Sequence, residues 1–236
     1  PSLFDYCNLT RFGGGARVLR RRMAGPSADP ETIQATQDSI RFIMANRELF
    51  TKMPSAYAAN KVDHYFHEVL PIAIKEQMVE FGLEVLSLWL NHDRHYSAIS
   101  LGVQMTCRYL RLLKEFVALP ELDEAKGELK SLLAEIQTLL ALPRISSVPE
   151  YSEGASPWRL IRLDQVFRLH EKSHIARLQE LLHEIDALVS LADVTTRHGL
   201  VLPDIETGPL GISGEGIVHP YVDQAVGNPV QLDKSK

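Results

Sequence analysis

A long, regularly apolar stretch without proline constrains the fold of this chain more than any other feature. Residues 74–118 contain no proline and only two glycines, Gly82 and Gly102. Apolar side chains recur at every third or fourth position, which is typical of a helix that buries one face. At roughly 1.5 Å per residue, a single helix here would extend about 60 Å. Globular helices average three or four turns, so we expect a strut, a coiled-coil arm or a lever.

A second helix of similar length is predicted over residues 158–196. Its apolar stripe consists of Leu178, Leu181, Leu182, Ile185, Leu188, Val189 and Ala192. Between the two long helices, residues 118–157 hold a polar helix near 121–141 and a loop from Pro143 to Pro157. Two long helices joined by a short excursion are expected to pack antiparallel. Residues 74–199 are therefore predicted to form paired lever helices with a short acidic tip at 118–157.

The segments on either side of the long helices differ from them in composition and in predicted secondary structure. Residues 1–73 predict a helical core subdomain, with a first helix over 1–24 that is broken around residues 12–15. Further helices are expected over 30–51, capped by Asp29, and over 56–69. Residues 200–236 contain five glycines and four prolines, with short β-type runs at 200–202 and 216–218. These are too few strands for an independent sheet, so we expect this tail to belong to a further domain.

Composition excludes several classes of protein. The formal net charge is −5, whereas a compact sequence-independent DNA binder is usually basic. The two cysteines, Cys7 and Cys107, are too far apart in sequence for a zinc ribbon or a disulfide framework and fit a reducing compartment. No run of about eighteen apolar residues predicts a membrane span, and the N-terminus lacks a signal pattern. We therefore expect a cytoplasmic protein.

Residues 170–174 read HEKSH and match the HExxH pattern of zinc proteases, in which two histidines one helical turn apart bind the metal and the glutamate activates water. Lys172 occupies a position that is usually uncharged, and Glu180 stands where a third histidine often follows. No further sequence pattern identifies Glu180 or His183 as a third metal ligand. Two surface histidines on a long helix are the favoured interpretation, and a zinc hydrolase is the less favoured one.

Other candidate chemistry is weaker. His64 and His67, and likewise His92 and His95, have metal-ligand spacing but no cysteine near them, so solvated histidines are favoured. The chain contains neither a Walker A motif nor a Gly-x-Ser-x-Gly elbow. The three glycines at 13–15 are better explained as a sharp junction between two helices than as a phosphate cradle.

The following helix presents three arginines, Arg17, Arg20 and Arg21. They are candidate ligands for DNA or phosphate. A solvated or salt-bridged helix face is the alternative, and the sequence favours it. No catalytic residue and no metal ligand is predicted for this chain.

A series of short segments, in order along the chain, resembles the core region of MutS-type DNA mismatch-repair proteins. The first two, SLFDYCNLT at 2–10 and GARVLRR at 15–21, are similar to the family's "SLLD-x-L-x-x-T" and "G-x-R-x-L-R" motifs. The others are IQATQDSI at 33–40, IDALVSLA at 185–192 with Leu202-Pro203 after it, and the pair GIVHP at 216–220 and NPVQL at 228–232.

The resemblance implies a fold class and a function. It implies a mainly α chain: a helical core domain with two long antiparallel lever helices, then a short β-rich tail that begins an ATPase domain. It also implies that Val226, Asn228 and Pro229 lie on a strand near a bound nucleotide. The chain itself would hold no cofactor, whereas its parent would bind ATP and magnesium, contact double-stranded DNA and form a homodimer through the ATPase.

The sequence also departs from the family pattern. The segment at 118–157 is shorter than the DNA-contacting clamp of the family, and it is acidic. Val218 replaces the family's arginine before His-Pro, and Ala225 stands where an aromatic residue stacks on adenine. A helical interaction scaffold that binds no DNA is therefore the alternative function.

Overall fold

The structure is a computed structural model that describes residues 2–91, 93–149, 155–206, 208, 211–222 and 224–233. Its α-helices are α1 (Leu3–Cys7), α2 (Gly13–Ala24), α3 (Pro30–Ala45), α4 (Ala56–His67), α5 (Met78–Asn91), α6 (Asp93–Val117), α7 (Gly127–Leu140), α8 (Pro143–Ser146), α9 (Pro157–Gln165) and α10 (Lys172–His198). Two 3₁₀ helices (Arg47–Lys52 and Pro120–Glu124), a π-helical turn (Val166–His170) and two strands, β1 (Gly211–Ile217) and β2 (Asn228–Asp233), complete it.

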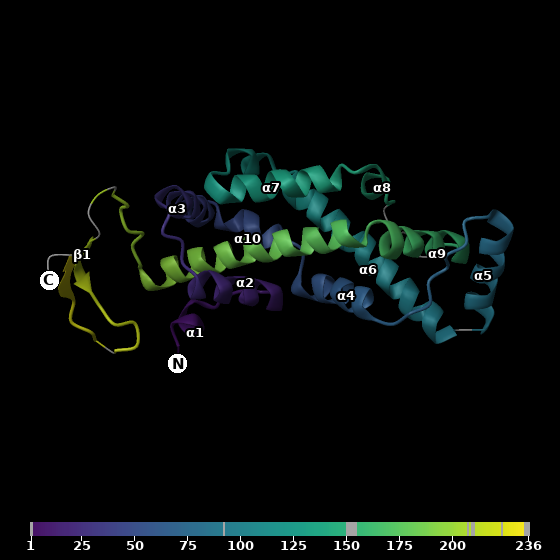
Figure 1. The fold of residues 1–236 in the computed structure, drawn as a ribbon, viewed down its shortest axis with the longest axis horizontal. Coiled ribbons are helices and arrows are strands. Elements are labelled where there is room, and N and C mark those ends of the chain that lie inside the picture. The colour runs from purple at the N-terminus through teal and green to yellow at the C-terminus, as the bar shows by residue number, and fades with distance from the viewer. Residues whose placement is uncertain are drawn as a thin grey trace.

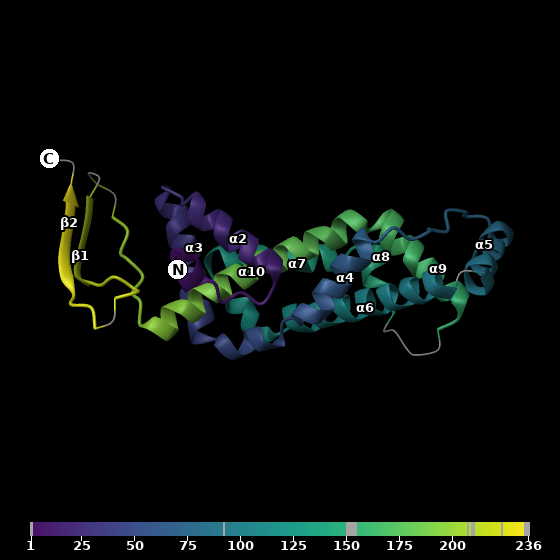
Figure 2. The same cartoon turned by 90° about the horizontal axis from the view of Figure 1, so that it is seen from below.

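The predicted class, mainly α with a short β tail, is confirmed. The helices form an elongated body in which α10 runs lengthwise, with α2 and α4 on one side and α3, α7 and α8 on the other (Figure 1). A view from below shows the same body with β1 and β2 at one end and α5 at the opposite end (Figure 2). Among the described helices, none combines the length and the apolar content that a membrane span requires.

Helix α10 forms the centre of the core because its apolar residues recur at helical spacing. All seven predicted stripe residues, from Leu178 to Ala192, are buried. The helix ends at Gly199, which adopts a left-handed conformation with φ of 61° and donates its backbone N–H to the last turn. Glycine suits this position because other residues are strained at positive φ. The end predicted near residue 196 is thus confirmed to within two residues, but the single helix predicted over residues 158–196 is wrong, because the π-helical turn and Glu171 divide it into α9 and α10.

The single helix predicted over residues 74–118 is wrong, because the chain forms two helices, α5 and α6, in that stretch. Helix α5 folds back against α6 and α9, so that Phe81, Val85 and Leu88 become buried. The ring of Phe81 lies edge-on to that of Trp158 in α9, with centroids 4.8 Å apart. A continuous helix would carry these three side chains beyond the end of the body, where no neighbouring helix removes them from water.

The two long helical runs are parallel, which corrects the predicted antiparallel pairing. Helix α7 returns the chain between them: Gln137 donates to the carbonyl of Val117, whereas Lys114 reaches the carbonyl of Ile145. The same helix runs antiparallel to α10, because Glu135 pairs with Arg177 while Arg144, further along, lies 3.5 Å from Glu171. Leu129, Leu133, Ile136 and Leu140 of α7 are buried. The predicted acidic tip therefore lies along the side of the body.

The C-terminal tail forms one antiparallel pair of strands. Ile212 pairs with Leu232 and Gly214 with Val230, and a bulge follows that contains Gly216 at φ of 68°. Every position in both strands is exposed or half-buried, so the pair has no core of its own. Residues 200–202, predicted as a strand, form no regular element, because they have no strand partner among the described residues.

Candidate functional site: the junction between the helical body and the C-terminal strands

Side chains of α10 hold the loop between α1 and α2, although this loop lies about 180 residues earlier in the chain. The hydroxyl of Ser190 accepts the backbone N–H of Leu9 at 2.8 Å and donates to the carbonyl of Cys7 at 2.8 Å. The carboxylate of Asp186 accepts the backbone N–H groups of Arg11 at 3.1 Å and Phe12 at 3.0 Å. The loop is therefore fixed to α10 by four backbone groups.

Two glycines allow this close approach. A Cβ placed on Gly15 would lie 2.1 Å from the carboxylate oxygen of Asp186, and one on Gly14 would lie 2.2 Å from the ring of His183. Gly13 would meet nothing within 4 Å. A junction between two helices is present as expected, but the break lies at residues 8–12 rather than around residues 12–15, and the three glycines form the first turn of α2. Gly14 and Gly15 face α10 across the tightest part of this contact.

Asp186 is buried, and its environment changes its protonation. Burial raises the pKa of Asp186 to about 6, against the smaller opposing effect of the N–H groups of Arg11 and Phe12. The neighbouring His183 is also affected: burial lowers its pKa, and the positive charge of Arg17 lowers it further. We therefore expect the contact between α2 and α10 to depend on pH in the mildly acidic range.

An aromatic cluster joins the end of α10 to α1 and to the C-terminal segment. The ring of Tyr6 stacks on that of His198, with centroids 4.3 Å apart, and meets the ring of Tyr221 edge-on at 5.5 Å. The hydroxyl of Tyr221 donates to the carbonyl of Ser2 at 2.6 Å. Tyr221 directly follows the His219-Pro220 pair of the GIVHP segment. The segment before β2 is thus tied to the first helix of the body.

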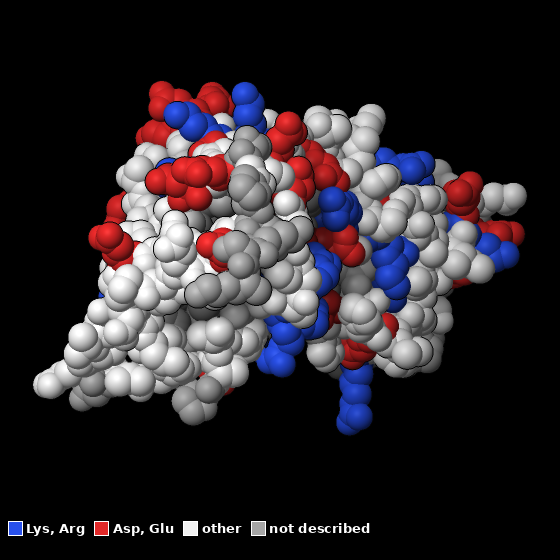
Figure 3. All heavy atoms as spheres, turned by 60° about the vertical axis from the view of Figure 1, so that its left-hand side comes forward, with Lys and Arg blue, Asp and Glu red and all other residues white. Residues whose placement is uncertain are grey.

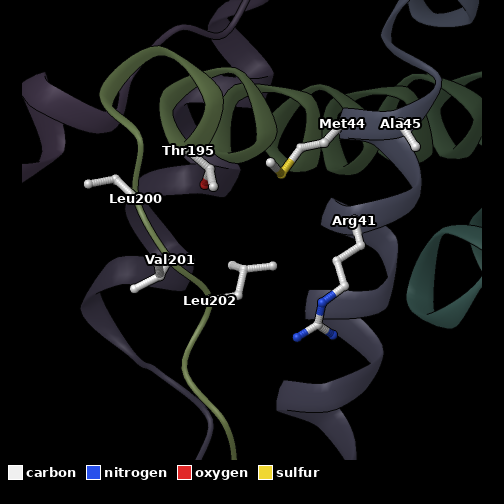
Figure 4. A pocket seen from close by; sticks show the side chains of 7 residues that line it. All are labelled: Arg41, Met44, Ala45, Thr195, Leu200, Val201 and Leu202. Carbon is white, nitrogen blue, oxygen red and sulfur yellow. The ribbon is translucent and has the colours of Figure 1, made fainter. Parts of the chain in front are cut away.

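A second attachment lies where the chain leaves α10. Gln37 of α3 is buried and donates to the carbonyl of Pro203 at 2.8 Å, while its own carbonyl accepts a hydrogen bond from Arg41. Next to it, a shallow groove opens between α3 and residues 200–202 (Figure 4). Met44 and Leu202 point into this groove, and Leu202 also packs against the core. The exit segment is therefore anchored to α3 by both polar and apolar contacts.

Two of the three candidate arginines, Arg20 and Arg21, contact protein groups. Arg21 forms an ion pair with Glu184, and the guanidinium of Arg20 lies 4.1 Å from the centre of the Phe4 ring. Arg17 is exposed. The adjacent Arg22 bonds both Glu128 of α7 and Glu184 of α10. Figure 3 shows the molecule with its C-terminal end toward the viewer, and on this face Lys and Arg side chains are interspersed with those of Asp and Glu. The salt-bridged alternative thus describes Arg21 well.

The candidate nucleotide-proximal residues lie on or just before β2. Asn228 and Pro229 are exposed within the strand, and the side-chain amide of Asn228 donates to the carbonyl of Val226 at 3.1 Å. Val226 is 79% exposed. The structure does not bring these three residues together with Arg17, Arg20 or Arg21 through any contact that it describes.

The HExxH match falls on a break in the helix. The π-helical turn ends at His170, and Glu171 has φ of −114° and ψ of 8°, so a regular helix begins only at Lys172. The carboxylate of Glu171 is buried and binds the Nδ1 atom of His174 at 2.9 Å. Its position differs from that of a water-activating glutamate between two metal-bound histidines on one regular turn.

Of the other two histidine pairs, only His64 and His67 lie wholly within the described residues. The Nδ1 atoms of His64 and His67 face Glu68 and Asp63, each at 3.5 Å, at the exposed end of α4. His92 lies outside the described residues, so its pairing with His95 has no structural account. Across the described ranges, no three His, Cys, Asp or Glu side chains are arranged to hold a metal ion.

The structure therefore brings together segments that sequence analysis had singled out only by resemblance. The segments at 2–10 and 185–192 meet through Ser190, those at 33–40 and 202–203 through Gln37, and Tyr221 joins the GIVHP segment to the first. Sequence reasoning missed the roles of Asp186 and Ser190, although a signal existed: both are polar residues four apart on an otherwise apolar stripe.

A scan of the sequence against models of known protein families matches none of them.

Proposed function

We propose that this chain is the core and lever region of a MutS-like DNA mismatch-repair or recombination ATPase. In this proposal it couples ATP-driven changes in an adjoining ATPase domain to DNA binding, and it performs no catalysis itself. ATP and magnesium bind to the adjoining domain, and the parent protein dimerises through that domain. Double-stranded DNA is the proposed partner.

One observation supports this proposal most directly. Several segments that resemble the family motifs meet at one end of an elongated helical body. There Tyr221, which follows the GIVHP segment, contacts Ser2 and Tyr6 at α1, and α1 in turn contacts α10. A displacement of the strands would act on Tyr221 and then on Tyr6 and His198. Packed helices resist deformation while contacts between bodies rearrange, so motion at this junction would reach the body as a whole.

The junction can be tested through Tyr221→Ala in the parent protein. We expect the dependence of DNA affinity on ATP, measured by fluorescence anisotropy, to fall severalfold, while ATP hydrolysis without DNA is unchanged. Tyr57→Ala is the matched control, because Tyr57 is an exposed tyrosine on α4 and lies outside the junction. Unchanged coupling in the Tyr221 variant would reject the junction as the transmission point.

Electron-electron resonance distances provide a second test. Spin labels at Lys172 on α10 and Val226 before β2 should change their separation when the parent protein binds ATP. Labels at Lys172 and Lys130, both within the helical body, should keep theirs. The sequence encoded after Lys236 gives a simpler check, because the proposal expects a Gly-x-x-x-x-Gly-Lys-Ser/Thr motif there.

An interaction scaffold without DNA binding is the second candidate. The net charge of −5 and the paired arginines favour it over a phosphate-coating surface. A parent protein that binds no double-stranded DNA at low salt, with or without ATP, would favour the scaffold over the MutS-like function.

A further inference from the structure

The outer surface of α5 is apolar although it faces solvent. Six of its side chains are between 46% and 77% exposed: Met78, Val79, Leu83, Leu86, Trp89 and Leu90. We call these six residues the α5 face. Among the exposed positions of α5 that the structure describes, only Glu80 and Ser87 are polar. The opposite side of the helix, with Phe81, Val85 and Leu88, is already buried in the body.

The exposed apolar area is large for a surface that remains in water. Trp158 of α9, 41% exposed, extends the face beside Gly82, where its ring lies 3.1 Å from an ideal Cβ position. If each of the seven side chains exposes on the order of 100 Å² of apolar area, the patch presents about 700 Å² to solvent. The largest apolar patch of a typical monomer is roughly 300–600 Å², and a stable interface buries about 800 Å² per partner. The patch therefore approaches the area that a stable dimer needs.

The spacing of the face suits a second helix of the same kind. Val79, Leu83, Leu86 and Leu90 follow one another at intervals of four, three and four residues, which is the pattern of a seam between two helices. An antiparallel copy related by a two-fold axis would place Val79 against Leu90 and Leu83 against Leu86. A two-fold interface requires such a self-complementary patch.

We propose that the α5 face is a homodimer contact, in which α5 of one chain packs antiparallel against α5 of a second copy. The face lies at the opposite end of the molecule from both the N-terminus and the C-terminal strands (Figure 1). This contact is separate from the dimerisation assigned above to an adjoining ATPase domain, and it does not depend on the proposed function.

Sedimentation velocity of the 236-residue chain tests the proposal over a range from about 1 µM to about 100 µM. We expect a monomer–dimer equilibrium that Leu83→Glu abolishes, because the new carboxylate would be buried against Leu86 of the partner copy. Glutamate is a good helix former, so circular dichroism should show that the variant keeps its helix content. Leu232→Glu is the matched control, since Leu232 is 59% exposed and Leu83 62%; it should dimerise like the natural sequence.

Disulfide trapping tests the antiparallel pairing. Chains with Val79→Cys, mixed with chains carrying Leu90→Cys and oxidised gently, should link through the two introduced thiols, whereas Val79→Cys chains alone should link far less. Equal linking in both samples would overturn the pairing. A chain that stays monomeric at every concentration, or a dimer that Leu83→Glu leaves intact, would overturn the α5 face as a homodimer contact and leave it to a different partner.

Discussion

The carboxylate of Asp186 accepts a hydrogen bond from the backbone N–H of Phe12 at 3.0 Å, across 174 positions of the chain. Burial raises the pKa of Asp186 from 3.8 to about 6 in the folded protein. The folded state therefore binds a proton more tightly than the unfolded state. Proton binding to Asp186 therefore stabilises the folded state. This stabilisation is fully present below pH 3.8 and is lost as the pH rises through about 6.

The expected consequence is a measurable slope in stability. Between pH 4 and pH 7, the free energy of unfolding of the natural sequence should fall by about 2–3 kcal/mol relative to that of Asp186→Asn. Urea titrations of both proteins at several pH values give this difference, and His183, which titrates in both, largely cancels. A difference that stays constant over this range would contradict the raised pKa.

The glycines that start α2 should differ in their tolerance of a methyl group. Gly15→Ala should destabilise the protein by roughly 1–3 kcal/mol, because its Cβ would collide with the Asp186 carboxylate. Gly13→Ala should be neutral or stabilising by up to about 1 kcal/mol, since space is open there and alanine limits the unfolded chain. Thermal melting of the two variants compares the same substitution two residues apart. Equal melting temperatures would show that α2 does not pack on α10 as closely as described.

Two neighbouring arginines on α2 provide another contrast. Arg22 is about three-quarters buried and bonds Glu128 and Glu184, so Arg22→Ala should cost on the order of 1–3 kcal/mol. Arg21 is 70% exposed, and Arg21→Ala should cost less than about 1 kcal/mol despite its ion pair with Glu184. Chemical denaturation in low and high salt measures both. A loss at Arg21 as large as that at Arg22 would count against this assignment.

A buried ion pair joins Asp164 of α9 to Arg168 of the π-helical turn. Arg168 and Asp164 are 5% and 1% exposed, and Arg168 also donates to the carbonyls of Leu70 and Pro71. Arg168→Met should cost roughly 3–5 kcal/mol, because it leaves the Asp164 carboxylate buried without its cation. The double variant with Asp164→Leu should recover part of that loss.

The exposed pair between Arg111 and Glu115 serves as the control for this experiment. Both side chains are about half exposed and sit four residues apart on α6. Arg111→Met should change the free energy of unfolding by less than about 0.5 kcal/mol. If the double variant at 164 and 168 proved less stable than Arg168→Met alone, the unpaired carboxylate would not be the source of the loss.

Local features of this fold follow from the sequence because they depend on neighbouring residues. The Asp29 cap, the end of α10 within two residues of the predicted position, and the buried stripe from Leu178 to Ala192 are all confirmed. Each rests on helix periodicity, a side-chain cap or a backbone that favours glycine. These effects act within a few residues, so the sequence displays them directly.

The break between α5 and α6 shows why other features of the fold could not be predicted from the sequence. Met78 and Trp89 belong to the apolar pattern, yet they are 76% and 49% exposed, because the helix turns back and only part of its apolar surface meets the body. Periodicity cannot reveal where supporting helices end. The same holds for Asp186: its spacing from Ser190 was visible, but its partners at residues 11 and 12 come from the far end of the chain.

The return of the chain through α7 gives the body three helical runs, formed by α6, α7 and α9–α10, where two were expected. Two rods side by side bend easily out of the plane that contains them. Three rods around a shared core form a prism, which resists flexure about every transverse axis, and a close-packed interior transmits strain. A twist applied at the last turn of α10 would therefore arrive at α5 as rotation of the whole prism.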